Sequence, residues 1–269
     1  MMNKIFFLDL DGTLLTTTKE ISPTTRKAID DWLTNGNILV LSSGRPLDSI
    51  KEVINNNNLS NKNVYAIGFN GSIFYDSYKD EIFLKRTLSI EDAVQIAHEA
   101  NDHGIYSHTY NSSHILTGKV DKELEFYRKS IHLPYTLLPD YPNGINEPPC
   151  KVLCINLETP EILEGFGKHL VSVFNGKVNS LKSNKYLLEV FPSASGKGKA
   201  VNDFADYMNI PIYDTIAAGD ESNDKSMLEA AGISIAMKNG KDELKEIATY
   251  ITDETNDHDG LAPFFYKFM

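Results

Sequence analysis

Three apolar segments that each end in small and acidic residues constrain most strongly how this chain of 269 residues can fold. They are KIFFLDLDGT at residues 4–13, NILVLSSGR at residues 37–45 and DTIAAGDESND at residues 214–224. The first run is apolar on both faces, which is typical of a central parallel strand covered by helices, and the other two are further buried strand candidates. Because ligands bind outside the carboxyl ends of such strands, we expect the three polar tips to meet at one crevice.

Helix signals alternate with these strands. Ser22 and Pro23 begin a segment in which Ile29 and Trp32 follow helical spacing, and Gly36 ends it. Alternation of strand and helix favours a parallel sheet with right-handed crossovers. We therefore predict an α/β protein whose core is a doubly wound, mostly parallel, Rossmann-like sheet.

The middle of the chain has a different pattern. Between about residues 83 and 189, short strand candidates alternate with amphipathic helix candidates, one of which begins at Ser89 with Asp92 three residues later. From about residue 190 the alternation of the first segment resumes. We predict a core domain of residues 1–82 and 190–269 with an inserted α+β domain of residues 83–189.

The composition of the chain limits the classes of molecule that it can bind. The net charge of -11 disfavours nucleic acid and anionic membranes, so a phosphate site must depend on local cations. The apolar N-terminal stretch is too short to span a membrane and lacks a cleavage-site pattern. Cys150 and Cys154 would lie roughly 13 Å apart on one strand, too far for a disulfide, so we expect reduced core thiols. We predict a cytoplasmic protein.

Two carboxylates interrupt the first apolar run. Asp9 and Asp11 are i and i+2 in an extended segment, so their side chains start on the same side, and Gly12 lets the chain turn away. Adjacent carboxylates repel unless they share a cation or a proton, and Mg²⁺ prefers oxygen ligands from carboxylates and phosphate. With Asp220 as a third oxygen ligand, the pattern predicts a magnesium site.

The other strand ends carry groups suited to an anion. Ser43 and Gly44 lie between a strand and a helix, where a hydroxyl and free backbone N–H groups can bind phosphate. The segment SGKGKA is not a nucleotide phosphate loop, because Phe191 occupies the position that requires glycine. Lys197 or Lys199 could still supply a positive charge to a phosphoryl group.

With these residues, the chain resembles the haloacid dehalogenase superfamily of phosphohydrolases, and most closely its Cof-type subfamily, subclass IIB. Four motifs in chain order carry the resemblance: Asp9-Leu10-Asp11-Gly12-Thr13, Ser43-Gly44-Arg45, Lys197-Gly198 and Gly219-Asp220-Glu221-Ser222-Asn223-Asp224. In the family, Thr is commoner than Ser at position 43, and Gly196 replaces the usual Ser. Further matches are FNGS at residues 69–72, AMKNG at residues 236–240 and DGLA at residues 259–262.

The resemblance implies a role for each matched residue. Asp9 would be the nucleophile that forms an aspartyl-phosphate, and Asp11 the general acid and base. Mg²⁺ would be held by Asp9, the backbone carbonyl of Asp11 and Asp220, with Asp224 supporting this shell. The phosphate ligands would be Ser43, Gly44, Lys197, Asn223 and the backbone amides after Asp9, beginning with that of Leu10. The inserted domain would be a cap that excludes water and contacts the leaving group.

The expected function is a Mg²⁺-dependent phosphatase of small phosphorylated metabolites, sugar phosphates foremost, that acts as a monomer or weak homo-oligomer. One alternative is a phosphosugar mutase, in which the aspartyl-phosphate persists until a second sugar hydroxyl arrives. Another is a non-catalytic phosphate-sensing domain, which would be shorter and would lack the acid at position 11. Release of inorganic phosphate distinguishes hydrolysis from the mutase reaction.

Overall fold

The computed structural model describes residues 3–61, 63–129, 131 and 133–269, and it divides the chain into two compact units. The core unit comprises Met1–Leu84 and Gly196–Met269, and the inserted unit comprises Lys85–Ser195. The predicted boundary at residue 189 falls inside strand β11 (Leu187–Pro192). Because β11 pairs with two strands of the inserted unit, that unit extends beyond the predicted boundary.

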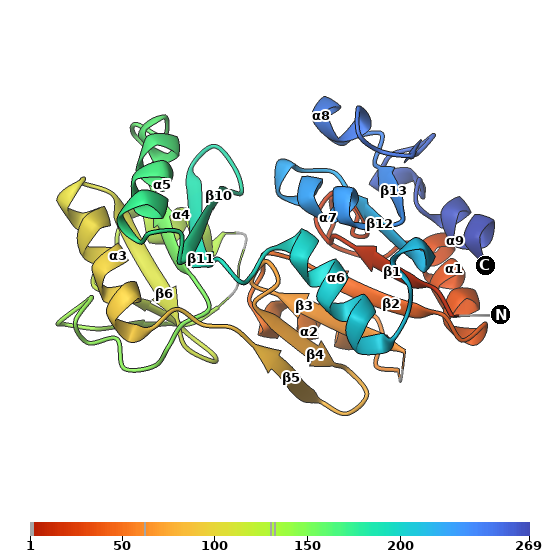
Figure 1. The fold of residues 1–269 in the computed structure, drawn as a ribbon, viewed down its shortest axis with the longest axis horizontal. Helices are drawn as coiled ribbons and strands as arrows, with labels where there is room; N and C mark the ends of the chain where they lie inside the picture. Colours follow the sequence, from red (N-terminus) through yellow and green to blue (C-terminus); the bar gives the residue numbers. More distant parts are fainter. Residues whose placement is uncertain (1–2, 62, 130, 132) are drawn as a thin grey trace. The chain divides into compact units, whose positions relative to one another are not determined.

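The core unit contains an eight-stranded sheet in the order β14-β13-β12-β1-β2-β3-β4-β5 (Figure 1). Its strands are β1 (Ile5–Leu8), β2 (Ile38–Ser42), β3 (Val64–Gly68), β4 (Ile73–Asp76), β5 (Glu81–Lys85), β12 (Thr215–Gly219), β13 (Ile233–Ala236) and β14 (Tyr250–Ile251). The strands from β14 to β3 are parallel, as predicted. Strands β4 and β5 were not predicted from the sequence, and β4 runs antiparallel to β3.

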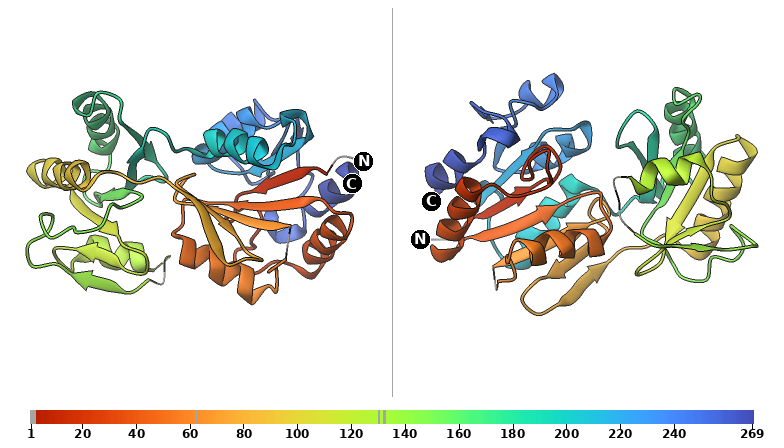
Figure 2. Two further views of the ribbon diagram at one scale, coloured as in Figure 1. Left: turned by 60° about the horizontal axis from the view of Figure 1, so that its bottom comes forward. Right: turned by 180° about the vertical axis from the view of Figure 1, so that it is seen from behind.

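Helices cover both faces of this sheet (Figure 2). They are α1 (Pro23–Thr34), α2 (Leu47–Asn56), α6 (Lys197–Met208), α7 (Lys225–Ala230), α8 (Asp242–Lys245) and α9 (Ala262–Phe268), with 3₁₀ turns η1 (Ile212–Asp214), η2 (Ser222–Asp224) and η3 (Asn256–His258). Phe7 of β1 packs on Phe204 of α6, whereas Phe6 packs on Trp32 of α1 and Phe265 of α9. Burial on both sides explains why the first apolar run has no polar face.

Helix α1 begins where the sequence predicts. The Ser22 side chain accepts a hydrogen bond from the Thr25 backbone N–H at 3.1 Å, and Pro23 is the first helical residue. A serine cap satisfies one of the amides that a helix start leaves unpaired, and proline has no such amide to satisfy.

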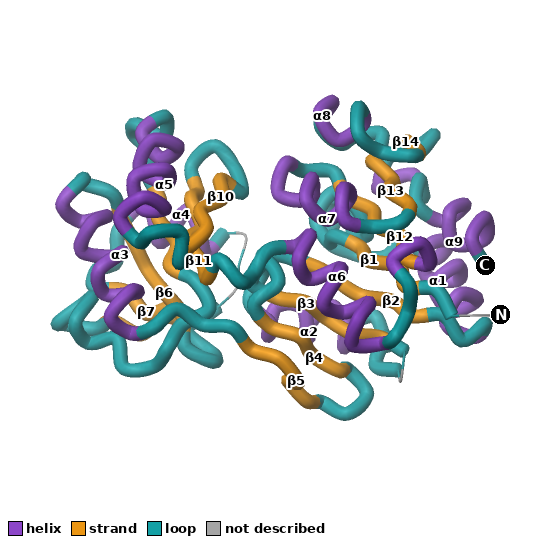
Figure 3. The backbone as a smooth tube through the Cα atoms, viewed as in Figure 1, coloured by secondary structure: helices purple, strands orange, loops and turns teal. Residues whose placement is uncertain are grey.

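The inserted unit contains a six-stranded sheet in the order β10-β11-β9-β6-β7-β8 (Figure 3). Besides β11, its elements are β6 (Tyr106–Tyr110), β7 (Ile115–Thr117), β8 (Tyr135–Leu137), β9 (Val152–Ile155), β10 (Val178–Lys182), α3 (Ile90–Asp102), α4 (Lys122–Arg128) and α5 (Ile162–Val173). Val152 and Cys154 of β9 pack in one apolar cluster with residues of α3 and α5. Cys150 and Cys154 are buried free thiols, as predicted.

Within the part of the chain that the structure describes, none of the helices has the length and apolar character needed to cross a bilayer.

Candidate active site

The site lies at the carboxyl ends of three adjacent strands. Leu8 of β1 is in register with Ala218 of β12 on one side and with Leu41 of β2 on the other. Asp9 therefore emerges beside Asp220, which follows β12, and the Ser43 loop follows β2. The parallel topology thus brings together motifs that lie up to about 210 residues apart in the chain, as parallel sheets do at this edge.

Lys197 connects two of these motifs. It is the first residue of α6, and its side chain is almost completely buried. Its Nζ donates to Asp9 Oδ1 at 2.5 Å and to Asp224 Oδ1 at 2.6 Å. The alternative candidate, Lys199, pairs with Asp203 on the exposed side of the same helix. Lys197 is therefore the lysine of the site.

A buried acidic group surrounds this lysine. Carboxylate oxygens of Asp9, Asp220 and Asp224 lie within 4.8 Å of one another. Thr13 Oγ1 donates to Asp220 Oδ1 at 2.8 Å, and Asp224 Oδ2 accepts from the Asp220 backbone N–H at 3.0 Å. Gly12 has φ +77°, and a Cβ there would lie 2.3 Å from the Asp220 carboxylate, so only glycine fits this turn.

The carboxylates of this buried group outnumber its one ammonium. Burial and the charge of Asp224 raise the pKa of Asp9 well above its ordinary value, against the opposing effect of Lys197. Burial and Asp224 also raise the pKa of Asp220 to about 7. Although burial lowers the pKa of Lys197, Asp224 and Asp9 raise it more, so the ammonium stays charged. One ammonium does not neutralise three buried carboxylates.

These residues fit a Mg²⁺ ion. Carboxylate oxygens are the ligands that this ion prefers, and three of them converge here. In addition, the buried Asn223 Oδ1 has no hydrogen-bond partner among the described residues. A divalent cation at this group would offset the excess negative charge, which adds to the effect of burial in raising the pKa of Asp9.

Asp11 lies in a different environment from Asp9. Strand β1 ends at Leu8, and the next residues turn, with the Leu14 backbone N–H donating to the Asp9 carbonyl. The alternation of a strand, from which we predicted that both carboxylates can face one ligand, therefore does not set the direction of the Asp11 side chain. The Asp11 carboxylate binds Arg45 and Lys19 and is not part of the acidic group.

The phosphate-binding candidates after β2 lie in one turn. Ser43 is buried, and its Oγ accepts from the Arg45 backbone N–H at 3.2 Å. Gly44 lies between them. Leu10 is fully buried, and its backbone carbonyl accepts from the Leu15 N–H.

Residues of two additional sequence matches contact the loops of the site. In FNGS, the Asn70 backbone N–H donates to the Ser43 carbonyl, and Gly71, at φ +92°, packs so closely on Gly196 that a Cβ would lie 2.6 Å from its carbonyl oxygen. In AMKNG, the Asn239 side chain donates to the Gly12 carbonyl at 2.8 Å. These contacts connect the loops that carry Ser43, Lys197 and Asp9.

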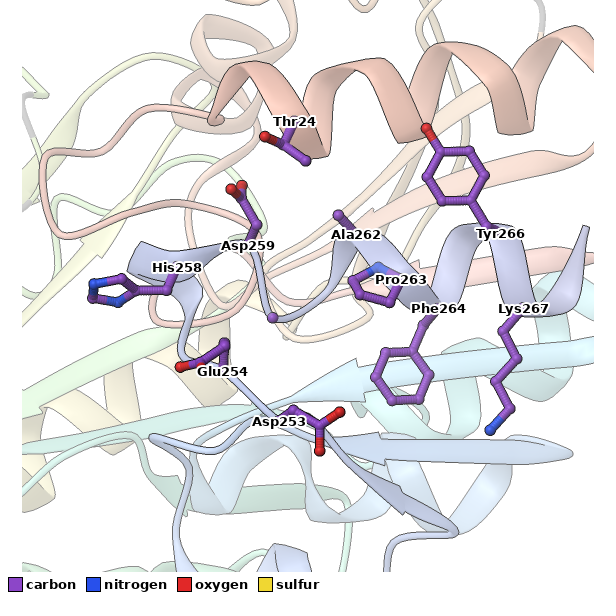
Figure 4. A pocket seen from close by; sticks show the side chains of 11 residues that line it. Thr24, Asp253, Glu254, His258, Asp259, Ala262, Pro263, Phe264, Tyr266 and Lys267 are labelled. Atoms are coloured by element: carbon purple, nitrogen blue, oxygen red, sulfur yellow. The ribbon is translucent and has the colours of Figure 1, made fainter.

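The DGLA match instead contacts the first turn of α1. Asp259 accepts hydrogen bonds from the hydroxyls of Ser22 and Thr25. Asp259 also lines a hollow of about 660 Å³, with Ala262, Pro263 and Phe264 among its walls (Figure 4). None of the predicted site residues lines this hollow.

Three residues that shape the site were not predicted from the sequence. Thr13 and Arg45 were quoted as parts of motifs but received no role, although they bind Asp220 and Asp11. Lys19 carries no motif signal. It contacts Asp11 from a left-handed backbone conformation at φ +65°, which a lysine in the sequence does not reveal.

The haloacid dehalogenase-like hydrolase family model matches residues 6–265, so the chain belongs to that family. A 5-amino-6-(5-phospho-D-ribitylamino)uracil phosphatase of Bacillus subtilis is 30% identical, covering 99% of this chain and 98% of its own length. A second B. subtilis protein of that name is 28% identical, covering 97% and 96%.

A solved structure agrees with this result. The crystal structure of a haloacid dehalogenase-like hydrolase from Bacteroides thetaiotaomicron matches with a TM-score of 0.88 at 28% identity, covering 100% of both chains. The resemblance and fold class inferred from the motifs are confirmed, and the relatives support a hydrolase that acts on phosphate esters.

Proposed function

We propose that this protein is a Mg²⁺-dependent phosphatase that hydrolyses small phosphorylated metabolites through an aspartyl-phosphate at Asp9. The observation that carries the proposal is the contact of buried Lys197 with Asp9 and Asp224, beside the third carboxylate of Asp220. Such a group offers a nucleophile, a fixed positive charge and oxygen ligands for a cation in one place, which phosphoryl transfer requires.

In the first step, a carboxylate oxygen of Asp9 attacks the phosphorus and the bond to the ester oxygen breaks. Asp11 donates a proton to that leaving oxygen, which departs as an alcohol. In the second step, a water molecule attacks the phosphorus while Asp11 accepts its proton. The bond between phosphorus and Asp9 breaks, and inorganic phosphate leaves with the carboxylate regenerated.

Several groups would hold the phosphoryl oxygens during both steps. Lys197 supplies a buried charge, and Ser43 supplies a hydroxyl from the neighbouring strand end. Gly44, Asn223 and the Leu10 backbone N–H complete the proposed set. Donors fixed before the reaction stabilise the charge that develops on the transferring group without reorganising.

Asp9, Asp220 and the backbone carbonyl of Asp11 would hold the Mg²⁺ ion, with Asp224 supporting them. When bound, the ion neutralises phosphoryl charge and orients the oxygens for in-line attack. Asp224 fits its supporting role because its Oδ2 accepts from the backbone N–H groups of Asp220 and Glu221, which fixes the loop that carries Asp220.

We propose that the inserted unit is a cap that selects the leaving group, and that sugar phosphates and phosphorylated sugar alcohols are the leading substrates. The support is the pair of B. subtilis relatives, whose names specify a phospho-D-ribityl compound. We also propose a cytoplasmic location, which suits the buried free thiols Cys150 and Cys154, and a monomer or weak homo-oligomer.

A phosphate-release screen tests this function. The purified protein would be incubated with Mg²⁺ and a panel of sugar phosphates, 5-amino-6-(5-phospho-D-ribitylamino)uracil and nucleotide monophosphates. We expect release of inorganic phosphate, fastest from one of the first two classes, and no release by Asp9→Asn. An isomerised sugar phosphate without phosphate release would instead identify a mutase, and folded protein inactive on every ester would refute the proposal.

A further inference from the structure

Strand β5 forms one edge of the core sheet (Figure 1). It pairs with β4 on one side, and within the part of the chain that the structure describes no strand pairs with its other side. An edge strand presents backbone N–H and C=O groups along that side, to which a further strand can bind. At the opposite edge of the sheet β14 has only two residues, whereas β5 has five. The core sheet is therefore open to a further strand mainly at β5.

The middle of β5 is apolar and partly exposed. Its sequence is EIFLK, in which Ile82 is 46% exposed. Phe83 stacks on Tyr207 of α6 with the ring centroids 4.6 Å apart, and Tyr207 is itself exposed. Natural edge strands are commonly protected from association by proline or by charged residues. Strand β5 has no proline, and its two charged residues lie at its ends.

These two charges make β5 complementary to itself. Glu81 is the first residue of the strand and Lys85 the last, and both are exposed. Because side chains alternate along a strand, Glu81, Phe83 and Lys85 lie on one face. If two copies of β5 pair antiparallel about Phe83, each Glu81 lies opposite a Lys85, and each Ile82 lies opposite a Leu84. Opposite charges placed in this way stabilise a strand pair, whereas an in-register parallel pair would place like charges side by side.

The edge of the inserted sheet differs in this respect. Its edge strand β10 also has five residues, but the sequence VNSLK contains a lysine and no acid. Antiparallel pairing of β10 with a second β10 therefore forms no ion pair. Of the two five-residue edge strands that the structure describes, only β5 has charges that match those of a second copy.

We propose that β5 is an interface for a second copy of this chain, in which two β5 strands pair antiparallel about Phe83. The two core sheets would then form one sheet of 16 strands, eight from each copy. The arrangement has two-fold symmetry, so both copies use the same surface, as in most homodimers. Main-chain hydrogen bonds supply the affinity, and the two Glu81–Lys85 pairs fix the register and the direction. This dimer specifies the homo-oligomer proposed above and does not depend on the hydrolytic reaction.

Analytical ultracentrifugation of the full chain tests the interface. A contact of this size is weak, so we expect a monomer–dimer equilibrium that is measurable between about 10 and 500 µM. Glu81→Lys and Lys85→Glu each place like charges opposite one another at both symmetry-related positions. Each should therefore weaken the dimer at least about tenfold. The double variant Glu81→Lys/Lys85→Glu restores opposite charges and should dimerise as the parent does.

A mixture of the two single variants gives the sharpest comparison. Glu81→Lys makes both ends of β5 basic, and Lys85→Glu makes both ends acidic. The mixture should form a heterodimer at concentrations at which each variant alone is monomeric.

Glu164 and Lys168 of α5 provide the matched control. They are exposed and form an ion pair on the surface of that helix. Glu164→Lys and Lys168→Glu change the net charge by the same amounts as the β5 variants and should leave the dimer unchanged.

Hydrogen exchange provides a second measurement that needs no variant. In the parent, amides of β5 should exchange more slowly as the protein concentration rises, whereas those of β10 should not change. A chain that stays monomeric over the whole concentration range would overturn the proposal. A dimer that the single variants do not weaken, or that leaves β5 exchange unchanged, would overturn it as well and place the contact on another surface. Each of these results leaves the proposed phosphatase activity untouched.

Discussion

Each unit of the molecule contains a buried lysine paired with acid, and the two lysines differ in their surroundings. In the core unit, Lys197 contacts Asp9 and Asp224 beside a third carboxylate. In the inserted unit, Lys151 Nζ contacts Glu189 Oε2 at 2.6 Å, with both side chains at most 7% exposed. Among the described residues, only the acids around Lys197 form a group that could hold a metal ion.

The difference separates the candidate active site from a structural ion pair. Lys151 immediately precedes β9, and Glu189 lies on the neighbouring β11, so the pair joins adjacent strands. Although burial lowers the pKa of Lys151, the charge of Glu189 raises it above its ordinary value. Around Lys197 the carboxylates outnumber the ammonium and come from loops at strand ends. Excess buried charge, rather than burial alone, marks the candidate active site.

The largest expected effect concerns the structural pair. Lys151→Met leaves the Glu189 charge buried without this partner, which costs about 3–5 kcal/mol in the free energy of unfolding. Adding Glu189→Leu should recover most of that loss, because well-packed apolar residues can replace a buried ion pair. Chemical denaturation measures both variants. A double variant as unstable as Lys151→Met would show that the pair has a role beyond mutual neutralisation.

A similar substitution in the core unit should affect chemistry. We expect Lys197→Met to lower kcat for phosphate esters by about 10²–10³-fold, or about 2.7–4 kcal/mol, as the loss of one fixed donor to a transition state does. Steady-state kinetics on folded protein measures this effect. The matched control is Lys199→Met, which removes an exposed lysine of the same helix and should retain the parent rate. Equal losses from the two variants would contradict the assignment.

Mg²⁺ bound at the acidic group around Lys197 should stabilise the folded protein. At a Mg²⁺ concentration of 100 times its Kd, the free energy of unfolding should rise by about 2.7 kcal/mol, since the ion binds the folded state. Thermal unfolding with and without Mg²⁺ measures this rise. Asp220→Asn should reduce it, and Asp30→Asn, which alters an exposed acid on α1, should not. Stabilisation that persists in Asp220→Asn would place the ion elsewhere.

The smallest expected effect is a pH dependence in the inserted unit. Burial and Lys151 lower the pKa of His108 from 6.5 to about 3. Between these values the unfolded chain binds more protons than the folded one, so stability falls as the pH falls. From pH 7.5 to 5 this residue should remove about 2 kcal/mol, which is the difference expected between the pH profiles of the parent and His108→Gln. The variant His98→Gln, which alters an exposed histidine, should keep the parent profile. A parent-like profile for His108→Gln would show that His108 does not cause the pH dependence.

Local sequence signals were sufficient for much of this structure. The strands that carry Asp9, Ser43 and Asp220 were predictable because helices bury both of their faces, which leaves unbroken apolar runs. The Ser22 cap was predictable because its hydrogen bond spans only three residues. The convergence of the three strand ends followed from the parallel topology alone.

Contacts between distant segments were not predictable. Arg45 and Asp11 lie 34 residues apart, and no periodicity links them. The choice between Lys197 and Lys199 depends on which face of α6 is buried, which requires the packed sheet. The inserted unit ends at Ser195 and not near residue 189, because β11 belongs to the sheet of that unit through pairing with β9 and β10, a non-local interaction.

The most direct test of the central claim is to trap the phosphorylated carboxylate. The protein would be mixed with Mg²⁺ and an ester that it hydrolyses, quenched with acid and reduced with borohydride, which converts an aspartyl-phosphate to homoserine. Peptide mass spectrometry should find homoserine at position 9 and nowhere else, and none in Asp9→Asn, which should be folded and inactive on p-nitrophenyl phosphate. Homoserine at another aspartate, or Mg²⁺-dependent hydrolysis by Asp9→Asn near the parent rate, would contradict the account.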